Sequence, residues 1–493
     1  MRQLNRIPQN RWKPDKASSI PLYTQIIRYI CERITSGDWK IGMRLPSQRQ
    51  LAKTFLVNRS TIVTAMNMLI SDGLLDTAHG AGTYVSSNPW SLLIHRSVNW
   101  SHYVSTGSFR ENLPSVQAIN RYEATPGILR LGTGELSPDL FPRNYFQTAI
   151  EKVSRSVSSL GYAEPLGLLS LRKTLSSLLA KQDISASPSN ILVTSGSLQA
   201  LQLISVSILR AGATVFTESP SYLKSLQLFQ SAGLHLKGIP LDKDGLEYWR
   251  ISSSFFDFHR QTLLYTIPTN HNPTGITMSE RRRHELIEFC NHLQLPIIED
   301  DAYGSLYFEP NPPKPLKALD KNDAIIYLGT TSKSLAAGLR VGWLVAPEAI
   351  VQRLGDVKMQ MDYGASSLSQ LILTEIIESG NYTTYTKQLQ QKLLQRRNMA
   401  LTVLNEYFSD LGTWNIPKGG FYIWVTLRKR IPMEILFCKA IKKGILLNPG
   451  DMYDFNPNHS LRISYAYLNK QEFTKGIQEL AILIRSLSKN SSS

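Results

Sequence analysis

The chain of 493 residues is poor in cysteine, in acidic residues and in long apolar runs. Its 3 cysteines, Cys31, Cys290 and Cys438, lie far apart, which excludes a disulfide framework and any C-x-x-C metal or redox site. The uncharged stretch at residues 191–209 is too rich in serine and glutamine to span a membrane. The basic first residues lack the apolar segment of a signal peptide. We therefore expect a soluble, cytoplasmic protein with no bound metal and no membrane contact.

The shortage of acidic residues leaves a net charge of +16, and that charge is unevenly spread. Residues 1–90 carry 12 basic and 5 acidic side chains, so positive charge is several times denser there than in the remainder. Such a segment favours a polyanionic partner, although a solvated basic surface is an equally simple explanation of the charge alone. The length also exceeds what one ordinary core holds, which predicts at least two domains.

The basic segment has the pattern of a small helical domain. Apolar residues recur four positions apart within residues 20–36, which predicts a helix. Ser47 is placed to cap a second helix that ends near residue 55. Asn58 is placed to cap a third helix that ends near residue 72, with Gly73 as its left-handed terminator. Residues 74–85 then predict two short strands around a Gly-rich tip, which together form a hairpin wing.

The run RLPSQRQLAKTFLVNRSTIVTAMNMLISDGLL, followed by HGAGTYV, resembles the winged helix-turn-helix of GntR-type regulators. The resemblance implies binding to double-stranded DNA through the start of the first helix of the motif, the start of the recognition helix and the wing tip. The DNA-binding residues that it implies are Ser47, Arg49, Asn58, Arg59, Ser60, Thr61, His79 and Gly80. Arginine side chains, short hydroxyl groups and helix N-termini are the groups that hold phosphates and read bases.

The remainder of the chain alternates short β-rich runs with helical stretches. The predicted strands are residues 191–194, 213–218, 263–267, 296–300, 324–328 and 342–345, and the helical patterns include 198–209 and 279–293. This alternation predicts an α/β fold with a mostly parallel sheet and ligands at the carboxyl ends of its strands. We expect an extension at 1–19, a winged domain at 20–86, a partly packed linker at 87–130 and a large domain at 131–493. Its larger part covers about 180–350 and its smaller part about 365–493.

The loops after the predicted strands resemble, in order, those of fold-type I aminotransferases that use pyridoxal 5′-phosphate. They contain SGS, ESPSY, PTNHNPTG, DDAYG and TTSKSLAAGLR, and GYAEPLGLLSLRKTL precedes them. The resemblance implies that Lys333 forms the internal aldimine, a Schiff base with the cofactor aldehyde, and that Asp300 pairs with the pyridine nitrogen. It implies that Asn272 and Tyr303 hydrogen-bond the ring hydroxyl and that Tyr222 stacks on the ring.

The same resemblance assigns the phosphate and carboxylate ends of the site. The implied phosphate ligands are Ser195, Gly196, Ser197, Thr330, Ser332 and Arg340. Arg462, in NHSLRISYAY, corresponds to the arginine that binds the α-carboxylate of a substrate or effector. Tyr162 corresponds to a residue that reaches the cofactor phosphate from a neighbouring subunit.

A GntR-type head joined to an aminotransferase-like body is similar to the MocR, or GabR-like, regulators. This implies a head-to-tail homodimer that binds pyridoxal 5′-phosphate and a repeated or palindromic operator. Its body would sense an amino acid or amine, or the cofactor itself. The alternative is an active aminotransferase with an attached head, since Lys333, Asp300, Asn272 and Arg462 are all present. Because a winged head serves no metabolic purpose, we do not expect a multiple-turnover enzyme. A single aminotransferase half-reaction stays open.

Overall fold

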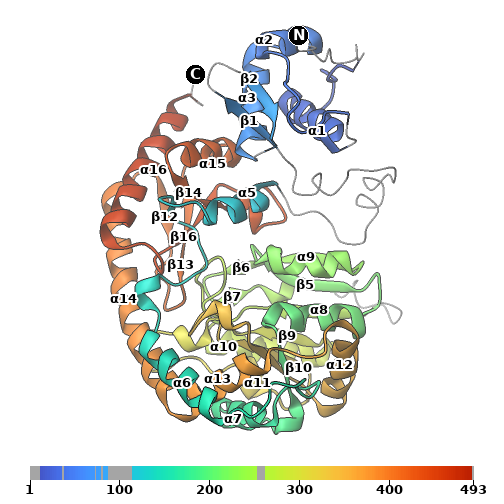
Figure 1. The fold of residues 1–493 in the computed structure, drawn as a ribbon, viewed down its shortest axis with the longest axis vertical. Coiled ribbons are helices and arrows are strands. Elements are labelled where there is room, and N and C mark those ends of the chain that lie inside the picture. Colours follow the sequence, from blue (N-terminus) through green and yellow to red (C-terminus); the bar gives the residue numbers. More distant parts are fainter. Residues whose placement is uncertain are drawn as a thin grey trace. The chain divides into compact units, whose positions relative to one another are not determined.

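The structure is a computed structural model that describes residues 12–35, 38–72, 74–78, 82–86, 114–252 and 261–490 (Figure 1). The chain divides into two compact units. One unit contains residues 1–128 and 438–443, and the other contains residues 129–437 and 444–493. Among the described residues, no helix combines the length and apolarity that crossing a membrane requires.

Three helices form the amino-terminal unit's winged domain, and all three were predicted. They are α1 (Leu22–Thr35), α2 (Gln48–Phe55) and α3 (Arg59–Ser71). The predicted cap of α2 is confirmed, because the Ser47 hydroxyl accepts a hydrogen bond from the Gln50 amide at 3.3 Å. The Gln50 side chain in turn accepts from the Ser47 amide at 3.0 Å, which completes a capping box. Asn58 occupies the N-cap position of α3, but its side chain makes no capping hydrogen bond, so that part of the prediction is wrong.

The helices of this domain enclose a small apolar core. Its centre contains Ile26, Ile30, Ile62, Ala65 and Leu69, all fully buried. Trp12 precedes the helices and stacks on Tyr29 with ring centroids 4.1 Å apart, so it extends this core. The strands β1 (Leu75–Ala78) and β2 (Gly82–Val85) pair antiparallel as the predicted wing. Gly73, His79 and Gly80 lie outside the described residues.

One helix occurs in the segment that was predicted to be a linker. Residues Pro114–Glu123 form α5, and its Val116, Ala118 and Ile119 are buried. The sequence shows little periodicity here because only this short run is apolar on one side. Part of the segment that was predicted to be a partly packed linker is therefore a helix.

The second unit is built on an eight-stranded sheet in the order β4-β11-β10-β9-β8-β5-β6-β7. Its strands are β4 (Ile191–Thr194), β5 (Thr214–Ser219), β6 (His235–Asp242), β7 (Gly245–Leu246), β8 (Thr262–Thr266), β9 (Ile297–Asp300), β10 (Ile325–Thr330) and β11 (Gly342–Val345). Strands β5, β6, β8, β9 and β10 are parallel, whereas β11 runs antiparallel to both β10 and β4. The mostly parallel sheet and its six predicted strands are confirmed, and β6 and β7 were missed.

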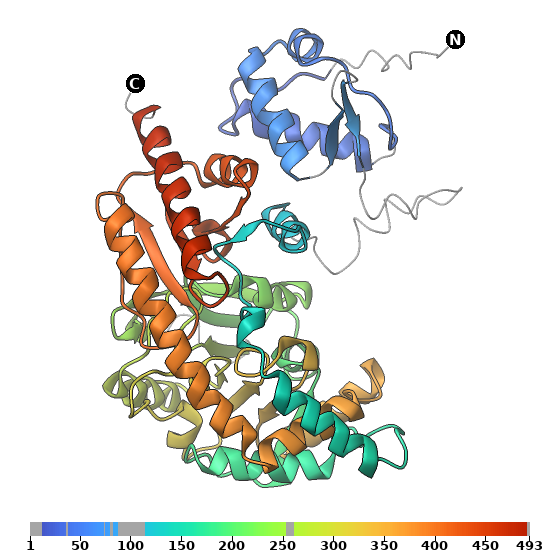
Figure 2. The ribbon, with the colours of Figure 1, turned by 60° about the vertical axis from the view of Figure 1, so that its left-hand side comes forward.

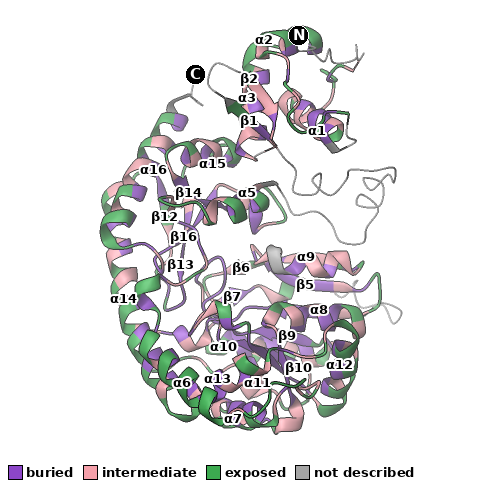
Figure 3. Ribbon diagram, viewed as in Figure 1, coloured by how far each residue is buried: buried purple, intermediate pink, exposed green. Residues whose placement is uncertain are grey.

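Helices cover both faces of this sheet, and its central strands β8, β9 and β10 are almost fully buried (Figure 3). Leu263, Tyr265 and Ile298 face α8 (Ser197–Ser207), α9 (Leu223–Ser231) and α12 (Glu348–Met361). The alternate residues Leu264 and Ile297 face α10 (Glu280–His292) and α11 (Leu316–Leu319). Because side chains alternate across a strand, a strand covered on both faces is apolar along most of its length.

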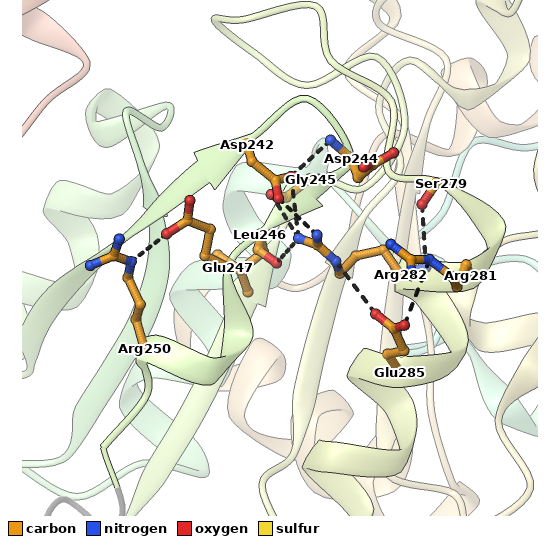
Figure 4. A network of polar contacts seen from close by, with 10 residues as sticks. All are labelled: Asp242, Asp244, Gly245, Leu246, Glu247, Arg250, Ser279, Arg281, Arg282 and Glu285. Carbon is orange, nitrogen blue, oxygen red and sulfur yellow. Dashed lines mark hydrogen bonds and ion pairs between the residues drawn. The ribbon is translucent and has the colours of Figure 1, made fainter.

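A buried arginine attaches the β6–β7 hairpin to α10 (Figure 4). The Arg282 guanidinium donates to Asp242 at 2.8 Å and to the Leu246 carbonyl at 2.7 Å. Its centre lies 4.6 Å from the ring of Trp249, and Glu285 pairs with it at 3.7 Å. These contacts neutralise a buried charge and fix the edge of the sheet, so we assign them a structural role.

The smaller part of this unit has its own antiparallel sheet in the order β12-β13-β16-β15. These strands are β12 (Gly412–Trp414), β13 (Tyr422–Leu427), β15 (Asn448–Pro449) and β16 (Ser460–Ser464).

A two-stranded parallel sheet pairs β3 (Leu129–Arg130) with β14 (Ile445–Leu446). The other helices are α6 (Arg143–Ser156), α7 (Leu169–Ala180), α13 (Ser367–Glu378), α14 (Asn381–Phe408), α15 (Met433–Lys442) and α16 (Lys470–Asn490).

The 28-residue helix α14 connects the two parts of this unit (Figure 2). It packs against α16 of the smaller part and against α13 and the short 3-10 helix η6 (Gly304–Leu306) of the larger part. Near η6, the Gln390 side chain donates to the Ser305 carbonyl at 2.9 Å.

Candidate functional site

Loops that follow the parallel strands carry the predicted site residues. Asp300 ends β9, Lys333 follows β10, and Asn272 follows β8. Because these strands run parallel, their carboxyl ends share one edge of the sheet. The predicted residues therefore lie on neighbouring loops.

Asp300 is a buried carboxylate with a specific hydroxyl partner. The Tyr265 hydroxyl donates to its Oδ2 at 2.7 Å, and the Ala302 amide donates to Oδ1 at 3.3 Å. Burial raises the pKa of Asp300 above its ordinary value, while these two donors and the charge of Lys333 oppose the rise. Tyr265 was missed, because one tyrosine in the apolar strand TLLYT is indistinguishable from a core residue by pattern.

The amine of Lys333 points toward a glycine in the segment that enters the unit. Its Nζ donates to the Gly134 carbonyl at 2.7 Å. A methyl group at Gly134 would lie 2.8 Å from the Tyr422 hydroxyl and 3.5 Å from Lys333 Nζ. Space remains beside the Lys333 amine because residue 134 is a glycine.

An anion-binding geometry forms at the start of α8. Gly196 is its N-cap residue with φ of +87°. The Arg340 guanidinium donates to the Ser195 carbonyl at 3.0 Å, and a methyl group at Gly196 would lie 2.6 Å from that guanidinium. A helix N-terminus beside an exposed arginine is a strong anion site, since free amide donors and a permanent charge converge there. The structure thus brings Ser195, Gly196 and Arg340 together, with Ser197 as the first residue of α8.

Two hydroxyl groups of the predicted phosphate ligands lie beside each other. The Thr330 hydroxyl is 3.0 Å from that of Ser332 and also donates to the Val341 carbonyl at 3.1 Å. The Ser332 amide donates back to the Thr330 hydroxyl at 3.1 Å. These bonds shape the turn between β10 and Lys333.

Arg462 is almost fully buried in β16 and is held from several sides. It donates to Asn272 Oδ1 at 2.8 Å and to the Gly132 carbonyl at 2.6 Å. Its guanidinium centre lies 4.1 Å from the Tyr422 ring and 4.8 Å from the Tyr453 ring. Its Nε has no hydrogen-bond partner among the described residues, so this arginine keeps a donor for a ligand.

Tyr303 connects this arginine's surroundings to the Asp300 loop. Its hydroxyl lies 2.9 Å from that of Tyr422, and both side chains are buried. Burial and the neighbouring Tyr422 raise the pKa of Tyr303 well above its ordinary value, so it stays protonated at neutral pH. Tyr422 and Tyr453 were not predicted. The GGFY run, which ends at Tyr422, was the available signal for that residue.

Two predicted aromatic residues lie at the margins of this group. Tyr222 is half-buried at the N-cap of α9, and the adjacent Ser221 amide donates to the Tyr453 carbonyl at 2.7 Å. Tyr162 is 89 % exposed, with its ring 5.4 Å from that of Tyr363. No contact between Tyr162 and the group around Lys333 occurs within the described residues.

The predicted DNA-binding residues that the structure describes lie at two helix starts of the head. Arg49 is in the first turn of α2, two residues after its cap Ser47, and both are exposed. Asn58, Arg59 and Ser60 are exposed at the start of α3, where Thr61 is half-buried. An exposed basic side chain at the N-terminus of a helix is suited to a phosphate backbone.

Comparisons with known proteins match both units. Residues 22–85 match "Bacterial regulatory proteins, gntR family", and residues 126–480 match "Aminotransferase class I and II". The chain is 46 % identical over 479 residues to YisV of Bacillus subtilis (strain 168), named as an uncharacterized HTH-type transcriptional regulator, covering 97 % of this chain and 99 % of YisV.

Solved aminotransferases resemble the second unit. A multiple substrate aminotransferase from Thermococcus profundus is 27 % identical with a TM-score of 0.75, covering 80 % of this chain and 100 % of that one. A kynurenine aminotransferase from Pyrococcus horikoshii, solved with PMP, is 31 % identical with a TM-score of 0.72, covering 76 % of this chain and 95 % of that one.

Proposed function

This chain belongs to the HTH-type transcriptional regulators that join a gntR-type head to an aminotransferase class I and II domain, and on that premise we propose how it works. The head binds operator DNA. The body holds pyridoxal 5′-phosphate, and an amino acid or amine that binds there changes the affinity for DNA. The MocR-like architecture predicted from the sequence is thereby confirmed, while the effector is part of our proposal.

The grouping of Lys333, Asp300 and Arg462 carries this proposal. An amine, a buried carboxylate and a buried arginine with a spare donor lie on loops at one sheet edge and on the adjoining strand β16. The amine suits the aldehyde of a ligand, and the carboxylate suits a ring nitrogen of the same ligand. The arginine suits a second molecule that bears a carboxylate. Few other ligands would use all three groups.

Pyridoxal 5′-phosphate fits the chemistry of the donor set. The glycine at Gly196 leaves room beside Arg340, where a side chain would displace the guanidinium. We assign the phosphate to the α8 N-terminus and Arg340, the ring nitrogen to Asp300, the ring hydroxyl to Asn272 and Tyr303, and covalent attachment to Lys333. When bound, the cofactor supplies an electron-withdrawing ring, and Asp300 would keep a proton on its nitrogen.

Absorption and trapping measurements test the cofactor assignment. Purified full-length protein should be yellow, and borohydride should fix the cofactor to Lys333, detected by peptide mass. Lys333→Ala should abolish the trapped peptide, whereas Lys321→Ala, at an exposed lysine, should leave it unchanged. A wild-type protein that takes up no cofactor would refute the assignment.

The assembly is proposed to be a head-to-tail homodimer. The exposed Tyr162 and Tyr363 rings support a partner surface near the predicted site. Two heads would then read a repeated or palindromic operator. Sedimentation of the holo-protein should give a dimer, and an operator cut to one half-site should bind more weakly. A monomer that binds both operators equally would contradict this assembly.

An active aminotransferase is the second candidate, and two observations favour it. Arg462 donates a hydrogen bond to Asn272 at 2.8 Å, and the two solved structures described above are named aminotransferases. The holo-protein should therefore be mixed with amino acids and 2-oxo acids. Sustained turnover would support the enzyme, whereas a spectral change that alters DNA affinity without turnover would support the regulator.

A further inference from the structure

We propose that Tyr422 couples Arg462 to the hydroxyl group of Tyr303, so that a carboxylate bound at Arg462 changes the hydrogen bonding at the cofactor ring. The inference rests on the proposed function, because it requires pyridoxal 5′-phosphate and a carboxylate ligand in the same site. Tyr422 acts here as a positioning residue between two groups that bind different molecules.

The face of the Tyr422 ring meets the arginine. The Arg462 guanidinium centre lies 4.1 Å from the ring centroid, and the tyrosine is buried. A cation held over an aromatic face is attracted by the ring, more strongly where both are shielded from water. A carboxylate that pairs with Arg462 would neutralise much of that charge and weaken its hold on the ring. Arg462 Nε, without a partner among the described residues, is available for such a pairing.

The hydroxyl group of Tyr422 meets Tyr303. The two oxygens are 2.9 Å apart, and a phenol has one proton to donate and two lone pairs. If Tyr303 donates its proton to the cofactor ring oxygen, it must accept the hydrogen bond from Tyr422. If the Tyr422 ring shifts against Arg462, its hydroxyl moves too. The hydrogen bond that this hydroxyl donates to Tyr303, and that orients the Tyr303 hydroxyl, would then change.

Tyr422 also borders the amine that would hold the cofactor. The site of a methyl group at Gly134 is 2.8 Å from the Tyr422 hydroxyl and 3.5 Å from Lys333 Nζ. The two polar atoms therefore face one small space, and a methyl group at Gly134 would displace the Tyr422 hydroxyl while only touching the amine. Tyr422 thus contacts Arg462 and Tyr303 directly and adjoins Lys333.

Tyr453 provides an internal comparison. Its ring also lies over Arg462, at 4.8 Å, and it is also buried. Its hydroxyl, however, lies 2.9 Å from the side-chain amide of Asn448, not beside Tyr303. A pair of Tyr→Phe variants therefore separates contact with the arginine from the hydroxyl link to Tyr303.

The test uses the full-length holo-protein and propionate, a carboxylate without an amine. The absorbance of the bound cofactor is followed against pH, with and without propionate. In the wild-type chain propionate should shift the pH midpoint of the absorbance change. In Tyr422→Phe propionate should still bind, but the shift should fall by more than half, whereas Tyr453→Phe should keep the wild-type shift. If Tyr422→Phe does not retain the cofactor, Gly134→Ala, which crowds the same hydroxyl, should reduce the shift.

Three results would overturn the inference alone: no shift in the wild-type chain, a full shift in Tyr422→Phe, or equal losses in both Phe variants. A merely structural role for the hydroxyl would change thermal stability without changing the propionate shift. A wild-type chain that takes up no cofactor would instead overturn the proposed function together with the inference.

Discussion

Replacement of Glu218 by glutamine should remove a large part of the pH dependence of stability. Glu218, in β5, is 1 % exposed, and its carboxyl group accepts hydrogen bonds from the Ile267 amide at 2.9 Å and from the Thr266 hydroxyl. Burial raises its pKa to about 7. The titratable groups that face it are His271, at 4.0 Å, and Tyr265. Burial lowers the pKa of His271 to about 3, so that ring is neutral at neutral pH.

The sign of the effect follows from the protons bound in each state. Between about pH 4.5 and 7 the folded chain keeps a proton on Glu218 that the unfolded chain has lost. The contribution of Glu218 to the free energy of unfolding therefore falls as pH rises through this window, whereas the lowered pKa of His271 makes an opposite contribution below about pH 6.5. Each pH unit of the window costs about 1.4 kcal/mol, so the window as a whole is worth about 3 kcal/mol.

Urea unfolding at pH 5, 6, 7 and 8, followed by circular dichroism, measures this contribution. From pH 5 to pH 8 the stability of the wild-type chain relative to Glu218→Gln should fall by about 2.5 kcal/mol. Glu288→Gln, at an exposed position of α10, should keep the wild-type dependence. Equal slopes in the wild type and Glu218→Gln would refute the assignment of a buried, protonated Glu218.

The remaining predictions concern the cofactor and DNA sites. Tyr265→Phe removes the hydroxyl donor of Asp300 and should weaken cofactor binding, measured by fluorescence titration, by about tenfold or more, because a hydrogen bond to a charged group is worth about 1.5–3 kcal/mol. Gly196→Ala should lower both stability, by about 1–2 kcal/mol for a left-handed residue, and cofactor affinity. Gly212→Ala, at a φ of +86° with open space around it, should lower stability but leave cofactor affinity unchanged. If Gly196→Ala and Gly212→Ala bound the cofactor equally well, crowding of Arg340 by a side chain at position 196 would be refuted. Arg49→Ala should weaken operator binding on all sequences and lower the salt slope in a gel-shift series by about one, whereas an unchanged slope would exclude a phosphate contact.

Local signals made most of the fold predictable. The Ser47 cap, the hydrophobic spacing of α1 and the apolar runs of the central strands each depend on residues close in sequence. Strands β6 and β7 escaped prediction because HLKGIPLD contains glycine and proline and is only partly buried at the sheet edge. Helix α5 escaped because its burial depends on packing, which a ten-residue pattern does not specify.

The contacts of the site were less predictable than its residues. The motif after β9 indicates Asp300 by itself, but its donor Tyr265 lies 35 residues earlier in the chain. Only the parallel register, which sets Tyr265 opposite Ile298, brings the two together. The same holds for Tyr422, which meets Tyr303 across 119 residues and through a different sheet. Pattern analysis finds groups that occur singly in loops and misses partners that tertiary folding supplies.

Helix α14 has a mechanical consequence for the second unit. At a rise of about 1.5 Å per residue its 28 residues form a rod of about 42 Å. It contains neither proline nor glycine, the usual causes of a sharp bend. One segment of the rod is bonded to η6, directly after the Tyr303 loop, and another packs on α16. The rod therefore links Ser305 of the larger part to α16 of the smaller part through one continuous helix that has no built-in point for a sharp bend.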